Sequence, residues 1–183
     1  MSALKRNFLG VDQIERGLLE VAAADPTVLI VGGLAMQLYG SDRLTADIDV
    51  AAGGRPSPDL QGSWPHLRPL TFGGVETRTP SGIPVDWIVR EDDFEQVYME
   101  AIGAGRRVEG VPLPVVSPEY LAVMKMIAGR EKDESDLIFL LQTDHADQKK
   151  TLRIVHRLLG SYAAQAFDRY CEEADWKKSR GSR

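Results

Sequence analysis

The sequence is poor in several residue types that define common protein classes. Its 183 residues include one cysteine, Cys171, and three histidines, His66, His145 and His156. A single cysteine cannot form an internal disulfide or a cysteine-based metal site, so we expect the thiol to be a half-buried apolar group. The histidines have no metal-ligand spacing to one another, and the chain has no Gly-x-Ser-x-Gly motif. These absences exclude cysteine redox, zinc hydrolase and serine hydrolase chemistry.

Long apolar runs are also missing. No stretch approaches the ~20 apolar residues that a membrane-spanning helix needs, and the start of the chain lacks the apolar run of a secretory signal. We therefore expect a cytoplasmic protein. The chain is 43% hydrophobic, which is enough to bury a core. Its formal net charge is −5, so it should not attract nucleic acid by net charge.

The first half of the chain has the pattern of a small sheet with helices. Helical spacing of apolar residues alternates with short β-branched runs, and glycines and prolines gather in turns between residues 53 and 118. The predicted elements are a helix over 11–24, a strand over 27–31, a Gly32-Gly33 turn, a helix over 34–39, a strand over 46–51, and a hairpin of strands 75–79 and 83–89.

The second half changes toward helix. Ser117-Pro118-Glu119 places a capping residue, a first-turn proline and an acid where a helix begins. The predicted elements are a helix over 92–102, an irregular two-stranded ribbon over 106–116, and helices over 117–128, around 137–141, over 152–159 and over 162–171.

The fold class that follows is α/β (α+β), with a small mixed twisted sheet and flanking helices, followed by a C-terminal helical subdomain. We expect the α/β core over 1–116 and the helical subdomain, closing the cleft, over 117–176. The tail, 177–183, has four basic residues and no acid, and we expect it to be disordered.

Two features of the α/β part indicate phosphate chemistry. A strand that ends in Gly32-Gly33 and leads into a helix lets backbone N–H groups approach a phosphate closely. Asp47 and Asp49, two residues apart on a strand, project from the same face and can share a hard cation such as Mg²⁺. Asp86 lies in an otherwise apolar strand, where an acid needs a partner or a cation.

Each of these features alone has a simpler interpretation. A diglycine after a strand is often only a turn, an Asp-x-Asp pair is often a solvated acidic face, and Asp86 could sit at the end of its strand. Arg43 could contact a phosphate or could pair locally with Asp42 or Asp47. The order of the features favours a shared site, because a chance composition would rarely produce it.

In that order, Gly32-Gly33, Asp47-Ile48-Asp49 and Asp86 resemble the signature of the nucleotidyltransferases of the DNA polymerase β type. The likeness covers about residues 27–90. More narrowly, Gly-Gly-x-Ala, Arg-x-Thr-x-Asp-Ile-Asp and the later segment from Lys125 to Asp136 look like the small bacterial nucleotidyltransferases grouped with abortive-infection and toxin-antitoxin transferases. The chain is considerably shorter than the phage-defence members, and its length is nearer that of small aminoglycoside nucleotidyltransferases.

The resemblance implies a role for each matched residue. The metal-binding and catalytic residues would be Asp47, Asp49 and Asp86, holding Mg²⁺ or Mn²⁺. The nucleotide-binding residues would be Gly32, Gly33, Thr45 and Lys125, and the residues lining the site would be Arg43, Arg130, Lys132, Asp133 and Asp136. The residues themselves also allow a solvated basic patch around Lys125, although helical spacing places its side chain on a different face from Met124 and Ile127.

The implied reaction moves a nucleoside monophosphate from a nucleoside triphosphate to an acceptor hydroxyl. Three hypotheses remain, and the first two differ in the acceptor. It is a macromolecule such as a tRNA end or a protein, as for a toxin-like transferase with a partner antitoxin, or it is a small molecule of the aminoglycoside type. In the third hypothesis, the domain is inactive and keeps the fold as a binding module.

Overall fold

The computed structural model describes residues 7–64 and 67–181. Contacts divide the chain into two compact units, Met1–Val115 and Val116–Arg183. His66 and the last two residues of the basic tail lie outside the described residues. Within the described ranges the elements are α1 (Val11–Ala24), β1 (Leu29–Ile30), α2 (Gly32–Leu38), β2 (Ile48–Ala51), α3 (Pro58–Ser63), β3 (Arg68–Pro69), β4 (Val75–Arg78), β5 (Pro84–Ile88), α4 (Glu95–Gly103), α5 (Pro118–Ala128), α6 (Glu131–Gln142) and α7 (Gln148–Gly181).

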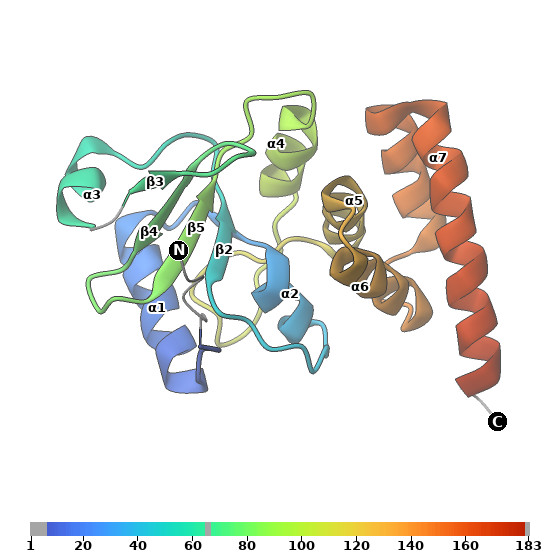
Figure 1. The fold of residues 1–183 in the computed structure, drawn as a ribbon, viewed down its shortest axis with the longest axis horizontal. Helices are drawn as coiled ribbons and strands as arrows, with labels where there is room; N and C mark the ends of the chain where they lie inside the picture. Colours follow the sequence, from blue (N-terminus) through green and yellow to red (C-terminus); the bar gives the residue numbers. More distant parts are fainter. Residues whose placement is uncertain (1–6, 65–66, 182–183) are drawn as a thin grey trace, which may run out of the picture. The chain divides into compact units, whose positions relative to one another are not determined.

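The first unit is built on one five-stranded sheet with the order β1-β2-β5-β4-β3 (Figure 1). The central pair, β2 and β5, is parallel, and the other three pairs are antiparallel. The predicted hairpin is the β4–β5 pair, in which Thr77 lies opposite Val85. The predicted α/β class with a small mixed sheet is therefore confirmed.

The core of the sheet gathers around Trp87. This residue alternates with Asp86 along β5 and is almost fully buried, so β5 has one apolar and one polar face at this point. The indole N–H of Trp87 donates to the carbonyl of Gly54 at 3.1 Å, and its ring meets Trp64 edge to face at 6.4 Å between centroids. An edge-to-face contact with a satisfied N–H fixes the ring and the strand that bears it.

The predicted two-stranded ribbon over 106–116 is wrong. In the described structure this segment pairs with itself at one bridge, between Arg106 and Val115. Val115 forms a second bridge outside the segment, to Ile30. Pro112 and Pro114 have no N–H group and therefore cannot extend a ladder. Two short elements, α3 and β3, also occupy the region expected to be loops. Helix α3 is capped by the Ser57 hydroxyl, which accepts from the Leu60 N–H at 3.3 Å.

The second unit consists of α5, α6 and α7, each of which contacts the other two. Ser117 caps α5 as predicted, accepting from the Tyr120 N–H at 3.5 Å. Helix α7 contains the two predicted helices, joined at Gly160, whose φ of 85° and ψ of 178° are not helical. Cys171 on α7 is half-buried, and burial raises the pKa of its thiol to about 11, which fits the expected apolar role.

The expected disordered tail is also corrected, because α7 continues through Gly181. Lys177 pairs with Glu173 one turn earlier at 2.9 Å, and Lys178 pairs with Asp144. The Arg180 guanidinium lies over the Trp176 ring at 4.3 Å from its centroid. The two ion pairs neutralise the charges of Lys177 and Lys178, and the ring of Trp176 attracts the Arg180 guanidinium. These contacts stabilise the last turns of α7.

No helix in the described ranges combines the length and the apolar character that crossing a membrane requires.

Candidate functional site

The site in the first unit is centred on two aspartates that face each other across the parallel strand pair. In the register of β2 and β5, Asp49 lies directly opposite Asp86. Residues opposite each other in neighbouring strands project from the same face, with Cβ atoms roughly 5 Å apart. The structure therefore brings together the second acid of the Asp-x-Asp pair and the acid predicted from a later strand.

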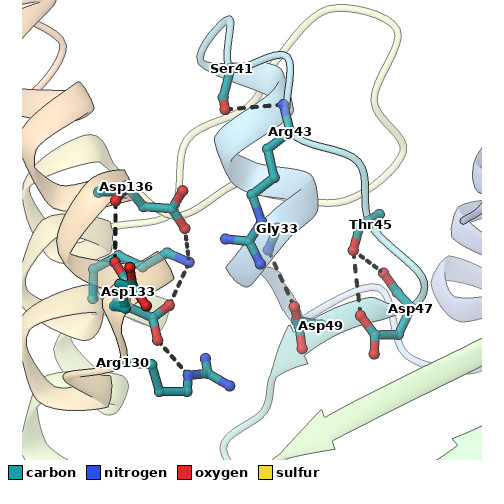
Figure 2. A network of polar contacts seen from close by, with 12 residues as sticks. Gly33, Ser41, Arg43, Thr45, Asp47, Asp49, Arg130, Asp133 and Asp136 are labelled. Carbon is teal, nitrogen blue, oxygen red and sulfur yellow. Dashed lines mark hydrogen bonds and ion pairs between the residues drawn. The ribbon is translucent and has the colours of Figure 1, made fainter. Parts of the chain in front are cut away.

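Asp49 packs against the diglycine. Its Oδ2 accepts a hydrogen bond from the Gly33 N–H at 3.3 Å (Figure 2). The Val31 N–H donates to the backbone carbonyl of Asp49 at 3.0 Å. Gly32 has a φ of +62°, and a Cβ built there would lie 1.9 Å from Asp49 Oδ2. Glycine is thus required at position 32 both by its backbone conformation and by the approach of the carboxylate.

The two glycines were predicted to form a turn before the helix and to bind phosphate. They are instead the first two residues of α2, and the anion that the structure places against them is the Asp49 carboxylate. A phosphate at the Gly33 N–H would therefore compete with Asp49.

Asp47 precedes β2 and is held by Thr45. The Thr45 hydroxyl, in a side chain that is only 4% exposed, is 2.9 Å from the Asp47 carbonyl and 3.4 Å from its Oδ1. Figure 2 shows Asp47 turned toward Thr45 and Asp49 turned toward Gly33. Thr45 therefore positions the loop before the acidic strand.

Arg43 lies in the same loop, beside α2. Its carbonyl accepts from the Gln37 amide at 2.7 Å, and its N–H donates to the Ser41 hydroxyl at 3.3 Å. A Cβ built at Gly33 would meet a terminal guanidinium nitrogen of Arg43 at 3.7 Å. The predicted residues Gly33, Arg43, Thr45 and Asp49 are thus neighbours in space.

One acid of this face is not among the residues predicted for the site. Glu76 on β4 lies opposite Asp86 in the register, so Asp49, Asp86 and Glu76 form a row across three strands. Arg68 on β3 lies opposite Glu76 and pairs with it at 2.7 Å. The predicted hairpin contained the signal, because pairing residues 75–79 with 83–89 around a tight turn brings Glu76 close to Asp86.

The donors present are suited to a hard divalent cation, since carboxylate oxygens are the ligands that Mg²⁺ and Mn²⁺ take in proteins. Two of the three predicted ligands, Asp49 and Asp86, are adjacent in register. Among the residues that the structure describes, however, no group of three His, Cys, Asp or Glu side chains converges closely enough to hold a metal. The carboxylates fit the metal by their chemical kind, and Asp49 and Asp86 also fit it by their positions on neighbouring strands. In this structure the Asp47 carboxylate contacts the Thr45 hydroxyl, and the Asp49 carboxylate contacts the Gly33 N–H.

In the second unit, the predicted residues Lys125, Asp133 and Asp136 form a buried ion network. The Lys125 ammonium lies 3.1 Å from Asp133 Oδ1 and 2.6 Å from Asp136 Oδ2, and the more exposed Arg130 contacts the other oxygen of Asp133 (Figure 2). Lys125 is 4% exposed and Asp133 is fully buried. Lys132, by contrast, is exposed.

Lys125, expected on a different face from the apolar residues Met124 and Ile127, is itself buried. All residues of α5 from Pro118 to Lys125 are buried, because the helix is apolar on most sides and α6 and α7 pack against it. The ammonium is engaged by two carboxylates of α6, so the structure gives Lys125 a role in joining α5 to α6.

Electrostatics within this network favour the charged forms. Burial acts to raise the pKa of Asp133, but the hydrogen bond from Arg130 and the charge of Lys125 outweigh it, so the pKa lies below its ordinary value of 3.8. The network thus keeps an ionised carboxylate in the interior by surrounding it with two cations.

The chain was compared with protein-family models, curated proteins and solved structures. No protein-family model matches the chain, and no curated protein matches it. Five chains of solved structures match, and one of them is described as "putative nucleotidyltransferase from H. pylori". It is 14% identical, the match covers 94% of this chain and 98% of that chain, and the TM-score is 0.47. Similarity at this level carries no conclusion about what the present chain does.

Replacing Gly32 with Ala should destabilise the first unit by about 2–4 kcal/mol. Part of this, roughly 1–2 kcal/mol, comes from the positive φ, and the rest comes from displacing Asp49. Gly40→Ala is the matched control, because Gly40 also has a positive φ of 84° but a Cβ there meets nothing within 4 Å. Urea unfolding followed by tryptophan fluorescence measures both. Equal losses in the two variants would show that Asp49 does not constrain position 32.

Lys125→Ala should lower the free energy of unfolding of the second unit by about 3–5 kcal/mol, because it leaves two buried carboxylates without their shared cation. The control is Lys132→Ala, which alters an exposed lysine and should cost less than about 1 kcal/mol. Circular dichroism during urea unfolding follows the helices. If Lys125→Ala is as stable as the control, the network is not structural.

The same network predicts an acid-sensitive stability. Because the folded pKa of Asp133 is depressed, its contribution is complete above the unfolded value near 3.8 and is lost as the pH falls through the lower folded value. Asp133→Asn should therefore reduce the loss of stability between pH 5 and pH 3 relative to the native chain. Urea titrations at several pH values would contradict this if both proteins showed the same dependence.

Proposed function

We propose that the chain is a metal-dependent nucleotidyltransferase that transfers a nucleoside monophosphate from a nucleoside triphosphate to an acceptor hydroxyl. The observation that supports it most is the parallel register of β2 and β5, which sets Asp49 opposite Asp86, with Asp47 two residues before Asp49. The strand order makes this pair central in the sheet. Two carboxylates held side by side on a rigid sheet are suited to phosphoryl chemistry with divalent cations.

Asp47, Asp49 and Asp86 are the residues that would hold Mg²⁺ or Mn²⁺. When bound, such ions neutralise triphosphate charge and lower the pKa of the acceptor hydroxyl. The contribution of the protein is to fix the carboxylates. Pairing with β5 fixes Asp49 along the sheet, the Gly33 N–H orients its Oδ2, and the Thr45 hydroxyl holds the loop that bears Asp47.

The proposed reaction is an in-line displacement. The acceptor oxygen forms a bond to the α-phosphorus, the bond from that phosphorus to the bridging oxygen of the β-phosphate breaks, and pyrophosphate leaves with the electron pair. Asp86 accepts the proton of the acceptor hydroxyl. Thr45 and the Gly32-Gly33 start of α2 lie beside Asp49 and are the candidates for contact with the nucleotide.

The acceptor separates two versions of this function. A macromolecular acceptor, a tRNA end or a protein, would make the chain a toxin-like or defence transferase with a partner antitoxin, as its resemblance to those transferases implies. A small hydroxylated cation is the alternative, and the acidic row that extends to Glu76 favours it, because carboxylates attract cations and repel RNA phosphates.

The function is tested by incubating the protein with each α-³²P-labelled nucleoside triphosphate, Mg²⁺ and a cell extract. Label on a macromolecule supports the first version, and label on a small product supports the second. Failure to transfer any of the four nucleotides, with Mg²⁺ or with Mn²⁺ added in its place, would indicate an inactive domain that keeps the fold as a binding module.

Asp49→Asn and Asp86→Asn should each reduce transfer to less than a tenth of the native rate, because each removes a charge from the proposed metal ligands while conserving shape. The control is Asp93→Asn, an exposed aspartate, which should transfer at the native rate. Initial rates at saturating Mg²⁺ measure the effect. Transfer by either site variant above a tenth of the native rate would remove that residue from the assignment.

A further inference from the structure

The loop over residues 39–47 connects α2 to β2, and hydrogen bonds of its main chain fix both of its ends. Near the start, the Gly40 N–H donates to the Gln37 carbonyl at 2.9 Å. Near the end, the Leu9 N–H donates to the Thr45 carbonyl at 2.9 Å. The middle of the loop is held in a different way, by a side chain of α2.

Gln37 provides this side chain. Its amide donates to the Arg43 carbonyl at 2.7 Å, and the Arg43 N–H donates to the Ser41 hydroxyl at 3.3 Å. Both main-chain groups of Arg43 are therefore engaged. Because Gln37 is itself part of a helix, its bond sets the position of the Arg43 backbone relative to α2. The point from which the arginine side chain extends is thus fixed before any ligand binds.

The Arg43 side chain lies against the start of α2, next to the carboxylate site (Figure 2). A Cβ built at Gly33 would lie 3.7 Å from a terminal guanidinium nitrogen of Arg43 and 2.9 Å from the Thr45 hydroxyl oxygen. The N–H of the same glycine donates to Asp49 Oδ2 at 3.3 Å. Arg43, Thr45 and Asp49 therefore all lie around Gly33. The loop places a half-buried cation close to the second acid of the Asp-x-Asp pair.

A bound triphosphate needs positive charge that the row of carboxylates does not supply. Asp49, Asp86 and Glu76 attract cations and repel phosphates. Lys125, the cation predicted for this role, is engaged by two carboxylates of α6. Arg43 is a cation that the structure sets near Asp49, and a planar guanidinium can bind two phosphate oxygens at once.

We propose that Arg43 binds a phosphate of the nucleoside triphosphate, and that Gln37 is the positioning residue that holds Arg43 for this contact through its main chain. This inference rests on the proposed function. It assigns the positive charge of the site to the loop between α2 and β2 and not to Lys125.

The first test is Arg43→Gln, which removes the charge and keeps a polar side chain. Isothermal titration with each of the four α,β-methylene nucleoside triphosphates and Mg²⁺ identifies the nucleotide that the native chain binds most tightly. The variant should bind this nucleotide at least about tenfold more weakly, as expected when a hydrogen bond between charged groups is lost. Arg55→Gln is the matched control, because Arg55 belongs to the same unit and its side chain, paired with Glu91, is 66% exposed. It should bind like the native chain.

The same variant separates this role from that of a counter-ion. If Arg43 only offsets the repulsion among the carboxylates, Arg43→Gln should melt at a lower temperature and bind the nucleotide as tightly as the native chain. The proposed phosphate contact instead requires weaker binding, measured at a temperature at which both proteins are folded.

Gln37→Met removes the amide donor and keeps the length of the side chain. Nucleotide binding should weaken about three- to tenfold, as expected for one neutral hydrogen bond. The change should add little in the Arg43→Gln background, because Gln37 acts through Arg43. Gln61→Met is the matched control, since the Gln61 amide donates to the Pro56 carbonyl at 2.6 Å and belongs to α3. It should bind like the native chain.

Transfer kinetics distinguish positioning of Arg43 from a general structural role. Loss of a phosphate contact made before and during the reaction raises KM and leaves kcat nearly unchanged. We expect this pattern for Gln37→Met. A displaced loop would also move Asp47, one of the proposed metal ligands, and would lower kcat.

Native-like nucleotide binding by Arg43→Gln, while the native protein binds and transfers, refutes the phosphate contact and leaves the proposed function intact. The positioning role of Gln37 is refuted by fully additive losses in the double variant, or by a lower kcat at unchanged KM in Gln37→Met. Absence of Mg²⁺-dependent nucleotide binding by the native protein itself refutes both the proposed function and this inference.

Discussion

The arrangement of the first unit depends on holding like charges opposite one another. Parallel pairing of β2 with β5 sets Asp49 beside Asp86, and antiparallel pairing of β4 with β5 adds Glu76 to the same row. Like charges directly opposite in a sheet are destabilising, so neighbouring groups must offset the repulsion. Arg68 pairs with Glu76 at one end of the row, and the Gly33 N–H donates to Asp49 at the other end. The missing side chain of Gly32 then leaves the space that the Asp49 carboxylate occupies.

The second unit also brings carboxylates close together, but it buries them with cations. Lys125 and Arg130 balance Asp133 and Asp136, and the two ion pairs of Lys125 join α5 to α6. A buried ion network contributes little net stability compared with well-packed apolar residues, but breaking it leaves a buried charge, which is strongly unfavourable. Such a network favours a single alignment of two helices, because a shift by one residue would separate the ammonium from its carboxylates.

Local signals were sufficient for several elements. Apolar spacing predicted α1 with its observed ends, and Ser117-Pro118-Glu119 predicted the start of α5. The same type of signal, Ser57-Pro58-Asp59, begins α3, within the region predicted to be turns. Alternation along β2 indicated an acidic face. It could not show that Asp49 lies opposite Asp86, because the register of two strands distant in the chain is set by their packing.

Side-chain environments were harder to predict than elements. Helical spacing puts Lys125 on a different face from Met124 and Ile127, and the packing of α6 and α7 around α5 buries it all the same. The Arg90 guanidinium lies over the rings of Phe72, from the loop before β4, and Tyr98, from α4, and no spacing rule connects these three residues. Contacts between separate segments are decided by tertiary structure, and a single sequence gives little information about them.

Because Trp87 follows Asp86 on β5, the protein has an intrinsic fluorescent probe next to this carboxylate. Trp87 and Trp64 are buried in contact within the first unit, whereas the third tryptophan, Trp176, is about half exposed on α7. Indole emission shifts to longer wavelength when the ring enters water, so the emission of the native chain is sensitive mainly to the first unit. A change at the polar face of β5 is one peptide unit away from a buried fluorophore. Intrinsic fluorescence can therefore follow the strand that bears Asp86 without any added label.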